Sequence, residues 1–253
     1  MKKYIWAIVI TVSFSACDIL KQAANEAIEQ ANATNNKLTE QEVIQGLKEA
    51  LDVGTGKAVS ILSKPNGYLG DAVVKIMLPP DAQEILKHKD DPLLRAVNLT
   101  KLVDDVVTAM NRSAEDAAKD ATPIFKNAIK AMTIQDAWNI LKGSDTAATH
   151  YFRQKTYNSL IELYKPIMSK SLNKPLVAGV SANTAWKALT SGYNQIAKTA
   201  GWRVVNTDLV DYATRKGVDG LFIKIAAEES RIRHNPSARI NDILRRVFDP
   251  NNW

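Results

Sequence analysis

Apolar side chains recur every three or four residues between Lys101 and Met132, and this period constrains the fold more than any other feature. The positions are Leu102, Val106, Met110, Ala114, Ala117, Ala121, Ile124 and Ala128. Because this spacing places them on one face of a helix, we expect a long helix here, disturbed at Pro123. Asn111 and Arg112 fall off the apolar face, so the simplest expectation is that both are solvated.

Capping signals and helix breakers divide the rest of the chain into further helices. Thr39 to Glu42 forms a capping box, and Thr133 with Asp136 repeats that pattern. The predicted helices cover about 39–62, a short segment from 81, 133–142, 145–164, 182–199, 208–216, 218–233 and 237–248, with breaks at Gly217 and Pro236. Residues 63–70 are predicted to form a loop. Since no segment shows the sustained alternation typical of strands, the sequence predicts an all-α fold in one bundle-like domain.

The first sixteen residues predict an export signal. Lys2 and Lys3 precede an apolar run over residues 4–12, which is too short to span a membrane as a helix. The ending Phe14-Ser15-Ala16-Cys17 resembles a bacterial lipobox, with Phe14 where Leu is usual, and Cys17 is the only cysteine among 253 residues. We therefore expect lipid attachment at Cys17; the alternative is an ordinary signal peptide followed by a chance cysteine.

Lipidation at that position sets the predicted domain organisation. Residues 1–16 form the signal peptide, 17–37 a lipidated tether, 38–249 the helical domain and 250–253 a C-terminal tail. Several acyl chains anchor a protein where one chain binds only reversibly. The expected location is therefore the bacterial cell envelope, on the periplasmic face, with the lipid membrane as a partner through acylated Cys17.

Charge is unevenly distributed along the chain. Residues 17–140 carry 18 acidic and 14 basic side chains, whereas residues 141–253 carry 9 acidic and 17 basic ones. A basic C-terminal half could face anionic lipid or an acidic partner, and the alternative is a solvated surface with a mild bias. No aromatic-basic recognition motif is present, so we expect no nucleic-acid partner.

Motifs that carry known chemistry are missing. Gly54-Thr55-Gly56-Lys57 lacks the spacing of a phosphate-binding loop, and His88, His150 and His234 have no His or Cys neighbour at ligand spacing. Neither a Gly-x-Ser-x-Gly elbow nor a paired-Cys pattern occurs. The sequence thus predicts no metal, no cofactor and no recognisable catalytic residue, and an enzyme of this sequence would have to use carboxylates.

Glu229 is the carboxylate that its position singles out. In the predicted helix 218–233 it falls within the apolar stripe, while Glu228 lies at the edge and Arg231 lies outside it. A carboxylate on an apolar face needs a partner, and Arg233 four residues on could supply a structural ion pair. The competing interpretation is a functional carboxylate in a cleft.

A second polar stripe follows Ser144 and Asp145, which are predicted to cap the helix 145–164. The stripe consists of His150, Arg153, Tyr157 and Tyr164, at helical spacing. These side chains could line an anion-binding groove, or they could form an aromatic core whose polar ends reach water.

Several longer runs resemble one uncharacterised bacterial family, the domain-of-unknown-function family 4197. They are Gly46–Leu51, Met110–Glu115, Asp136–Leu141, Asp145–Phe152, Asp219–Phe222 and Glu228–Arg233. The similarity extends over about residues 38–249. It implies an exported, often lipoprotein-like helical protein, and it brings no established activity or ligand.

Three functions remain open from the sequence. The first is a non-enzymatic envelope lipoprotein that binds an unknown protein or small molecule. The second is a carrier of an apolar or amphiphilic ligand between helices. The third is an enzyme that uses Glu229 with Asp145 or His150.

Overall fold

The computed structural model describes residues 38–87, 99–175 and 180–252, and over these residues the predicted all-α fold is confirmed. The α-helices are α2 (Glu40–Leu62), α3 (Asp81–Lys87), α5 (Leu99–Ala118), α6 (Thr122–Ala131), α7 (Ile134–Leu141), α8 (Ala147–Leu172), α9 (Ala182–Ala200), α10 (Leu209–His234) and α11 (Asp242–Val247), with 3-10 turns η2 (Pro236–Ala238) and η3 (Pro250–Asn252). The one strand-type pairing in these ranges is an isolated bridge between Pro175 and Ser181. The predicted signal peptide and tether lie outside the described residues.

Both predicted capping boxes are confirmed. At the start of α2 the hydroxyl of Thr39 accepts the N–H of Glu42 at 3.2 Å, and the Glu42 carboxylate accepts the N–H of Thr39 at 2.9 Å. Thr133 and Asp136 make the same two bonds at the start of α7. These bonds satisfy amides that a helix cannot pair internally, so two helix starts are set by local sequence.

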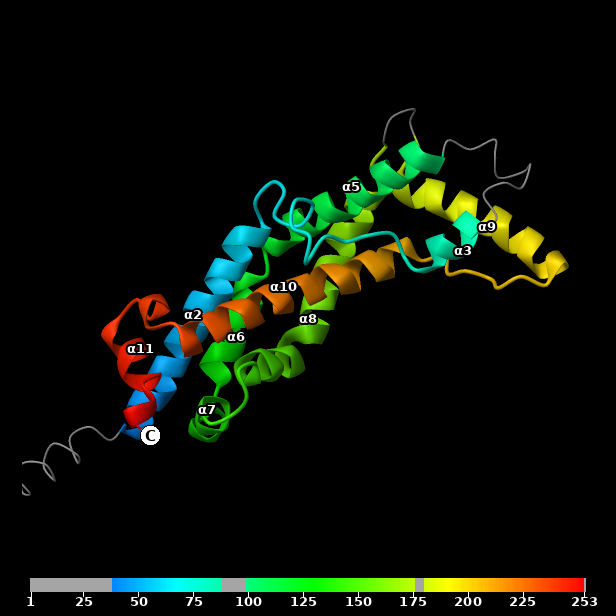
Figure 1. The fold of residues 1–253 in the computed structure, drawn as a ribbon. Coiled ribbons are helices and arrows are strands. Elements are labelled where there is room, and N and C mark those ends of the chain that lie inside the picture. Colours follow the sequence, from blue (N-terminus) through cyan, green and yellow to red (C-terminus); the bar gives the residue numbers. More distant parts are fainter. Residues whose placement is uncertain (1–37, 88–98, 176–179, 253) are drawn as a thin grey trace, which may run out of the picture.

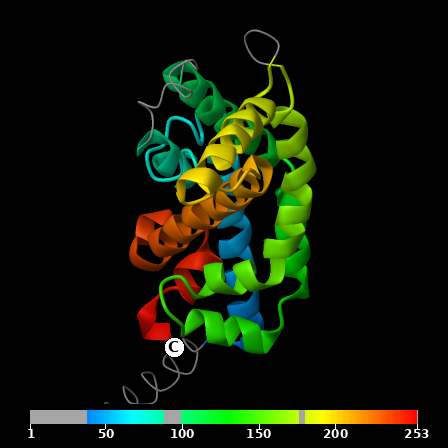
Figure 2. The same cartoon turned by 90° about the vertical axis from the view of Figure 1, so that its right-hand side faces the viewer.

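Helix α10 lies at the centre of the elongated body, between α2 and α8 (Figures 1 and 2). Helix α8 also packs against α5, while α6, α7 and α11 pack against α2. Rings from three helices meet in the core: Phe125 of α6 lies 5.6 Å from Phe152 of α8 and 6.2 Å from Phe222 of α10, between ring centroids. The start of α2 and the C-terminus lie at one end of the body, and α3 and α9 lie at the other (Figure 1).

The predicted helix over 101–132 is two helices. Helix α5 ends at Ala118 and α6 begins at Thr122, so the chain turns before Pro123 rather than at it. Proline fits this place because the first turn of a helix does not use its N–H. The prediction of one disturbed helix is therefore wrong in its boundary.

The predicted break at Gly217 is absent, since α10 continues through it from Leu209 to His234. A Cβ atom at Gly217 would lie only 2.8 Å from Cε of Met168 and 3.3 Å from Cδ1 of Tyr164. The glycine thus serves close packing between α10 and α8 rather than helix termination.

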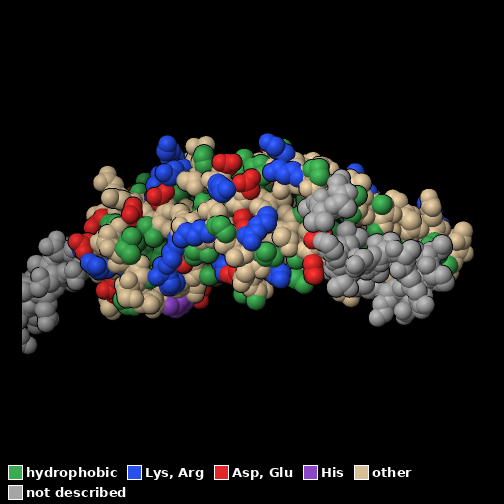
Figure 3. Space-filling model, turned by 90° about the horizontal axis from the view of Figure 1, so that it is seen from above, with side chains coloured by type: hydrophobic (Ala, Val, Ile, Leu, Met, Phe, Trp, Pro, Cys, Tyr) green, Lys and Arg blue, Asp and Glu red, His purple; other side chains and the backbone are tan. Residues whose placement is uncertain are grey.

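Helices from the acidic and the basic half of the sequence pack side by side. Because α2 and α5 pack against α8 and α10, the acidic and basic segments interleave in space. On the face seen from above, basic and acidic side chains lie next to one another (Figure 3). Among the described helices, none combines the length and the apolar character needed to cross a membrane.

Candidate functional site

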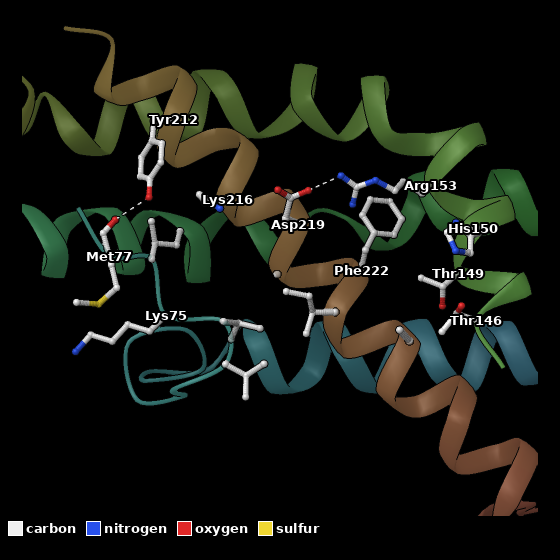
Figure 4. Close-up of a pocket in the computed structure, with 16 residues that line it drawn as sticks. Lys75, Met77, Thr146, Thr149, His150, Arg153, Tyr212, Lys216, Asp219 and Phe222 are labelled. Carbon is white, nitrogen blue, oxygen red and sulfur yellow. Dashed lines mark hydrogen bonds and ion pairs between the residues drawn. The ribbon is translucent and has the colours of Figure 1, made fainter. Parts of the chain in front are cut away.

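A groove of about 710 Å³ runs along α10 (Figure 4). One wall is the segment 73–77, the other is the first turns of α8, and the floor is α10 from Tyr212 to Ala226. Its volume lies within the range of small-molecule sites, about 300–1,000 Å³. The groove is therefore large enough to hold a ligand of that size.

Asn111 of α5 fixes the segment that forms the first wall. Its side-chain oxygen accepts the N–H of Ile76 at 2.8 Å, and its side-chain nitrogen donates to the carbonyls of Ile76 and Val107, each at 2.8 Å. Asn111 is fully buried, so the expectation that it is solvated is wrong. The backbone of residue 76 needs a partner where it passes α5, and the amide side chain provides both a donor and an acceptor.

Two contacts to α10 complete the support of this wall. The Tyr212 hydroxyl donates to the carbonyls of Met77 and Leu78 at 3.2 and 3.3 Å (Figure 4). The Lys224 ammonium forms an ion pair with Asp71, and its hydrogen bond lowers the pKa of that carboxyl. The wall is thus held from both sides by side chains distant in sequence.

Apolar side chains are exposed along the groove. Val73 is 69% exposed, Met77 59% and Ile223 41%, and all three line the groove beside Phe222 and Ala226. Exposed apolar groups gathered on one concave surface are typical of binding sites rather than of ordinary surface.

The charged groups of the groove are mostly basic. Arg153 donates to Asp219 at 2.6 Å, and its guanidinium lies 4.6 Å from the ring centroid of Tyr157 and 5.3 Å from that of Phe222. Lys75 and Lys216 are exposed, and neither has an ion-pair partner among the described residues. Asp219, the one acidic residue among the described residues that line the groove, is already paired.

The predicted stripe on α8 divides between the groove and the core. His150 and Arg153 line the groove, and Tyr157 lies beside it, stacked on Phe222 with 6.2 Å between ring centroids. Tyr164, two turns further along α8, is fully buried against Gly217 of α10, and burial raises the pKa of its hydroxyl. The stripe therefore divides: His150 and Arg153 line a groove, and Tyr164 belongs to the core.

Glu229 is buried and paired with Arg233, as we expected for a carboxylate on an apolar face. One oxygen accepts the N–H of Ala148 at 2.9 Å, and the other accepts the N–H and the hydroxyl of Thr149, each at 2.8 Å. These amides belong to the first turn of α8, which has no cap from its own side chains. The predicted capping by Ser144 and Asp145 is wrong, because Glu229 supplies the cap from α10.

The surroundings of Glu229 are filled. The void that it lines with Arg233 and Phe248 holds only about 20 Å³, about the space of one water molecule. The carboxylate accepts five hydrogen bonds, from Ala148, Thr149 and Arg233. This geometry is that of a structural group rather than of a carboxylate at the wall of an open pocket.

Glu228 is also buried, although the sequence placed it at the edge of the stripe. It pairs with Arg231 at 2.7 Å and with Lys57 at 3.4 Å, and both cations are more than a third exposed. Neither Glu228 nor Arg231 lines the groove.

A buried glutamate that the sequence analysis missed lies on α5. Glu115 accepts the N–H groups of Tyr68 and Leu69 at 3.2 and 3.1 Å and pairs with Arg112 at 2.7 Å. Arg112 also donates to the Asn66 side chain, so it is held in place, although its side chain is 42% exposed. Arg112 and Glu115 have the spacing of an ion pair on one helix face. No residue near them in the sequence indicated that Glu115 also binds the amides of the loop.

Asp145 lies outside the groove, in an arrangement that superficially resembles a hydrolase triad. Its carboxylate is 3.4 Å from Nε2 of His234, and Nδ1 of His234 is 3.4 Å from the Ser230 hydroxyl. However, Nδ1 is only 2.9 Å from the Ser230 carbonyl and so donates there, which leaves it unable to accept the hydroxyl proton. The His234 and Asp145 side chains are both at least 60% exposed. The geometry therefore does not activate Ser230.

Within the part of the chain that the structure describes, no group of three or more His, Cys, Asp or Glu side chains could hold a metal ion. A family model described as "Protein of unknown function (DUF4197)" matches residues 37–249. No curated protein and no solved structure matches the chain.

Proposed function

The chain belongs to the DUF4197 family of proteins of unknown function, and we propose that it is an exported lipoprotein that binds a ligand in the groove along α10. The observation that carries this proposal is the groove itself, where Val73, Met77 and Ile223 are exposed on one concave surface. Large apolar side chains exposed together favour a binding role.

A role in binding, rather than in catalysis, agrees with the positions of the polar groups. Glu229, which would have been the catalytic carboxylate, is saturated by donors, and Asp219 is paired with Arg153. A general base needs to reach a substrate proton, and the bonds to Glu229 leave it without that freedom.

A carrier that encloses its ligand between helices has less support. The void beside Glu229 and Arg233 is about 20 Å³, far below the volume of a lipid chain. An amphiphilic ligand would instead lie in the open groove.

The lipid anchor rests on the sequence alone. The lipobox-like ending before Cys17 supports attachment to the envelope on its periplasmic face. In this proposal Cys17→Ser releases the chain from washed membranes into the soluble fraction. Unchanged membrane association of that variant would contradict the anchor without affecting the groove.

Photo-crosslinking in the native envelope tests the groove. A photoreactive phenylalanine analogue at position 223 should give a discrete adduct, protein or lipid, detected by mass spectrometry of the purified chain. The matched control places the analogue at Val204, which is 50% exposed but lies outside the groove. The absence of an adduct at position 223, or the same adduct at both positions, would overturn the binding proposal.

A further inference from the structure

We propose that the ligand of the groove is a single-chain amphiphile with an acidic head group. This inference rests on the proposed function and adds the chemistry of the ligand. The head group lies toward Lys216 and Lys75, and the hydrocarbon chain lies over Phe222, Ile223 and Ala226.

The charge of the groove lining indicates the charge of the ligand's head group. Among the described residues that line the groove, three carry fixed positive charge, Lys75, Arg153 and Lys216, against one negative charge on Asp219. Since Asp219 pairs with Arg153, the two lysines remain as exposed cations without an ion-pair partner among the described residues. An anionic group placed between them gains attraction that a neutral or cationic group does not.

The apolar surface excludes a small inorganic anion as the whole ligand. Such an ion would leave Val73, Met77 and Ile223 in water, whereas a hydrocarbon chain would cover them. A purely apolar ligand, conversely, would give the two lysines no anionic group to pair with. A molecule with an anionic and an apolar part matches both kinds of lining.

The shape of the groove indicates a single extended chain. It follows α10 from Tyr212 to Ala226, which at 1.5 Å per residue is a length of about 21 Å. Lys216 lies toward the Tyr212 end on α10, and Lys75 lies on the opposite wall near that end (Figure 4). The two lysines without an ion-pair partner therefore lie at one end of the groove, beside Met77, and the lining continues past Asp219 and Phe222 toward His150 (Figure 4).

The ion pair of Arg153 with Asp219 gives a second expectation for ligand binding. Its guanidinium is fixed above Tyr157 and Phe222, and Asp219 occupies it as an internal anion. Removing the charge of Asp219 frees Arg153 and makes the groove more positive. Asp219→Asn should consequently tighten the binding of an anionic amphiphile, a gain that damage to the fold cannot produce.

The experiment uses the exported chain carrying Cys17→Ser, purified without detergent, and isothermal titration calorimetry with three probes. Dodecanoate has the chain and the acidic head, dodecyl maltoside has the chain with an uncharged head, and acetate has the head alone. We expect dodecanoate to bind at least about tenfold more tightly than either of the others, and to weaken as salt is added.

Variants locate the site. Lys216→Gln should weaken dodecanoate binding by about threefold, the size expected for an exposed ion pair, and Asp219→Asn should tighten it by a similar factor. Lys126→Gln is the control, because Lys126 is an exposed lysine on α6 outside the groove. Equal binding of dodecyl maltoside or acetate, no gain with Asp219→Asn, or equal weakening by the control would each overturn the proposal.

The two proposals fail separately. If dodecanoate does not bind while position 223 still gives its adduct in the envelope, the groove is a binding site for another class of ligand. If that adduct is also absent, both the ligand class and the binding role are wrong.

Discussion

The carboxylate of Glu229 accepts the backbone N–H of Thr149 at 2.8 Å, although 80 residues separate them. The same carboxylate accepts the N–H of Ala148 and pairs with Arg233. The first amides of a helix have no partner within the helix, so α10 supplies the N-terminal cap that α8 lacks. Arg233 also donates to the carbonyls of Ile140 and Leu141 at the end of α7, so this one pair joins three helices.

Removal of the Glu229 carboxylate should lower the free energy of unfolding more than removal of Glu228, although both side chains are buried. We expect Glu229→Ala to lower the free energy of unfolding by about 3–5 kcal/mol, because it leaves buried amides and the Arg233 charge without a partner. Glu228→Ala should lower it by at most about 1 kcal/mol, since Lys57 and Arg231 can return to water. Urea unfolding at pH 7, followed by circular dichroism, measures both. Equal losses would show that burial, and not the capping bonds, sets the cost.

The Asn111 side chain should stabilise the wall of the groove that segment 73–77 forms. Asn111→Ala leaves the N–H and carbonyl of Ile76 without their partner, and we expect it to cost about 2–3 kcal/mol. Hydrogen exchange at the amide of Ile76 should also become faster. Asn139→Ala is the control, because Asn139 is exposed and its side chain bonds, among the described residues, only to that of Gln135. Slow exchange at Ile76 in the variant would contradict the role of Asn111.

Local signals in the sequence predicted the class of fold and several helix boundaries. Capping boxes succeed because their partners are three residues apart, as at Thr39 and Thr133. The phase of α10 also placed Glu229 on the buried face correctly. All of these depend on interactions within a few turns of one helix.

The rest depends on contacts between distant segments. Asn111 looked solvated on its own helix, because the backbone that it bonds, at Ile76, is 35 residues away. The groove could be anticipated only through His150 and Arg153, since the segment 73–77 carries no motif. From the sequence, Gly217 predicts the end of a helix. Its actual role, close packing against Tyr164 and Met168, depends on residues of another helix.

The ion pair of Asp71 with Lys224 predicts a pH-dependent stability. Because the hydrogen bond from Lys224 lowers the pKa of Asp71 in the folded state, the pair stabilises at pH values above the ordinary Asp value of about 3.9. That contribution is lost as the pH falls through the lowered pKa. We expect Asp71→Asn to lower Tm by about 2–3 °C at pH 7, and the difference from wild type to shrink below about pH 4.

Thermal unfolding at a series of pH values measures this effect. Asp52→Asn is a suitable control, since Asp52 is exposed on α2 and its side chain has no ion pair among the described residues. If the difference in Tm between wild type and Asp71→Asn stayed constant down to pH 2, the charge of Asp71 would not be what stabilises the folded protein.

The same substitution should have opposite effects at two helical glycines. At Gly220 of α10 a Cβ would lie 2.6 Å from Cε1 of Tyr68, a fully buried ring whose hydroxyl donates to the Gly217 carbonyl at 2.7 Å. At Gly192 of α9 a Cβ would meet nothing within 4 Å. The first site is overpacked by a methyl group, while the second is not.

We therefore expect Gly220→Ala to destabilise the protein by about 1–3 kcal/mol, because Tyr68 is anchored at both its ring and its hydroxyl and cannot move aside. Gly192→Ala should stabilise it by about 0.5–1 kcal/mol, because alanine loses less backbone entropy in a helix. Both values come from urea unfolding at pH 7. If Gly220→Ala were stabilising as well, Tyr68 would have to be free to shift, and its close contact with Gly220 would not be what fixes the loop against α10.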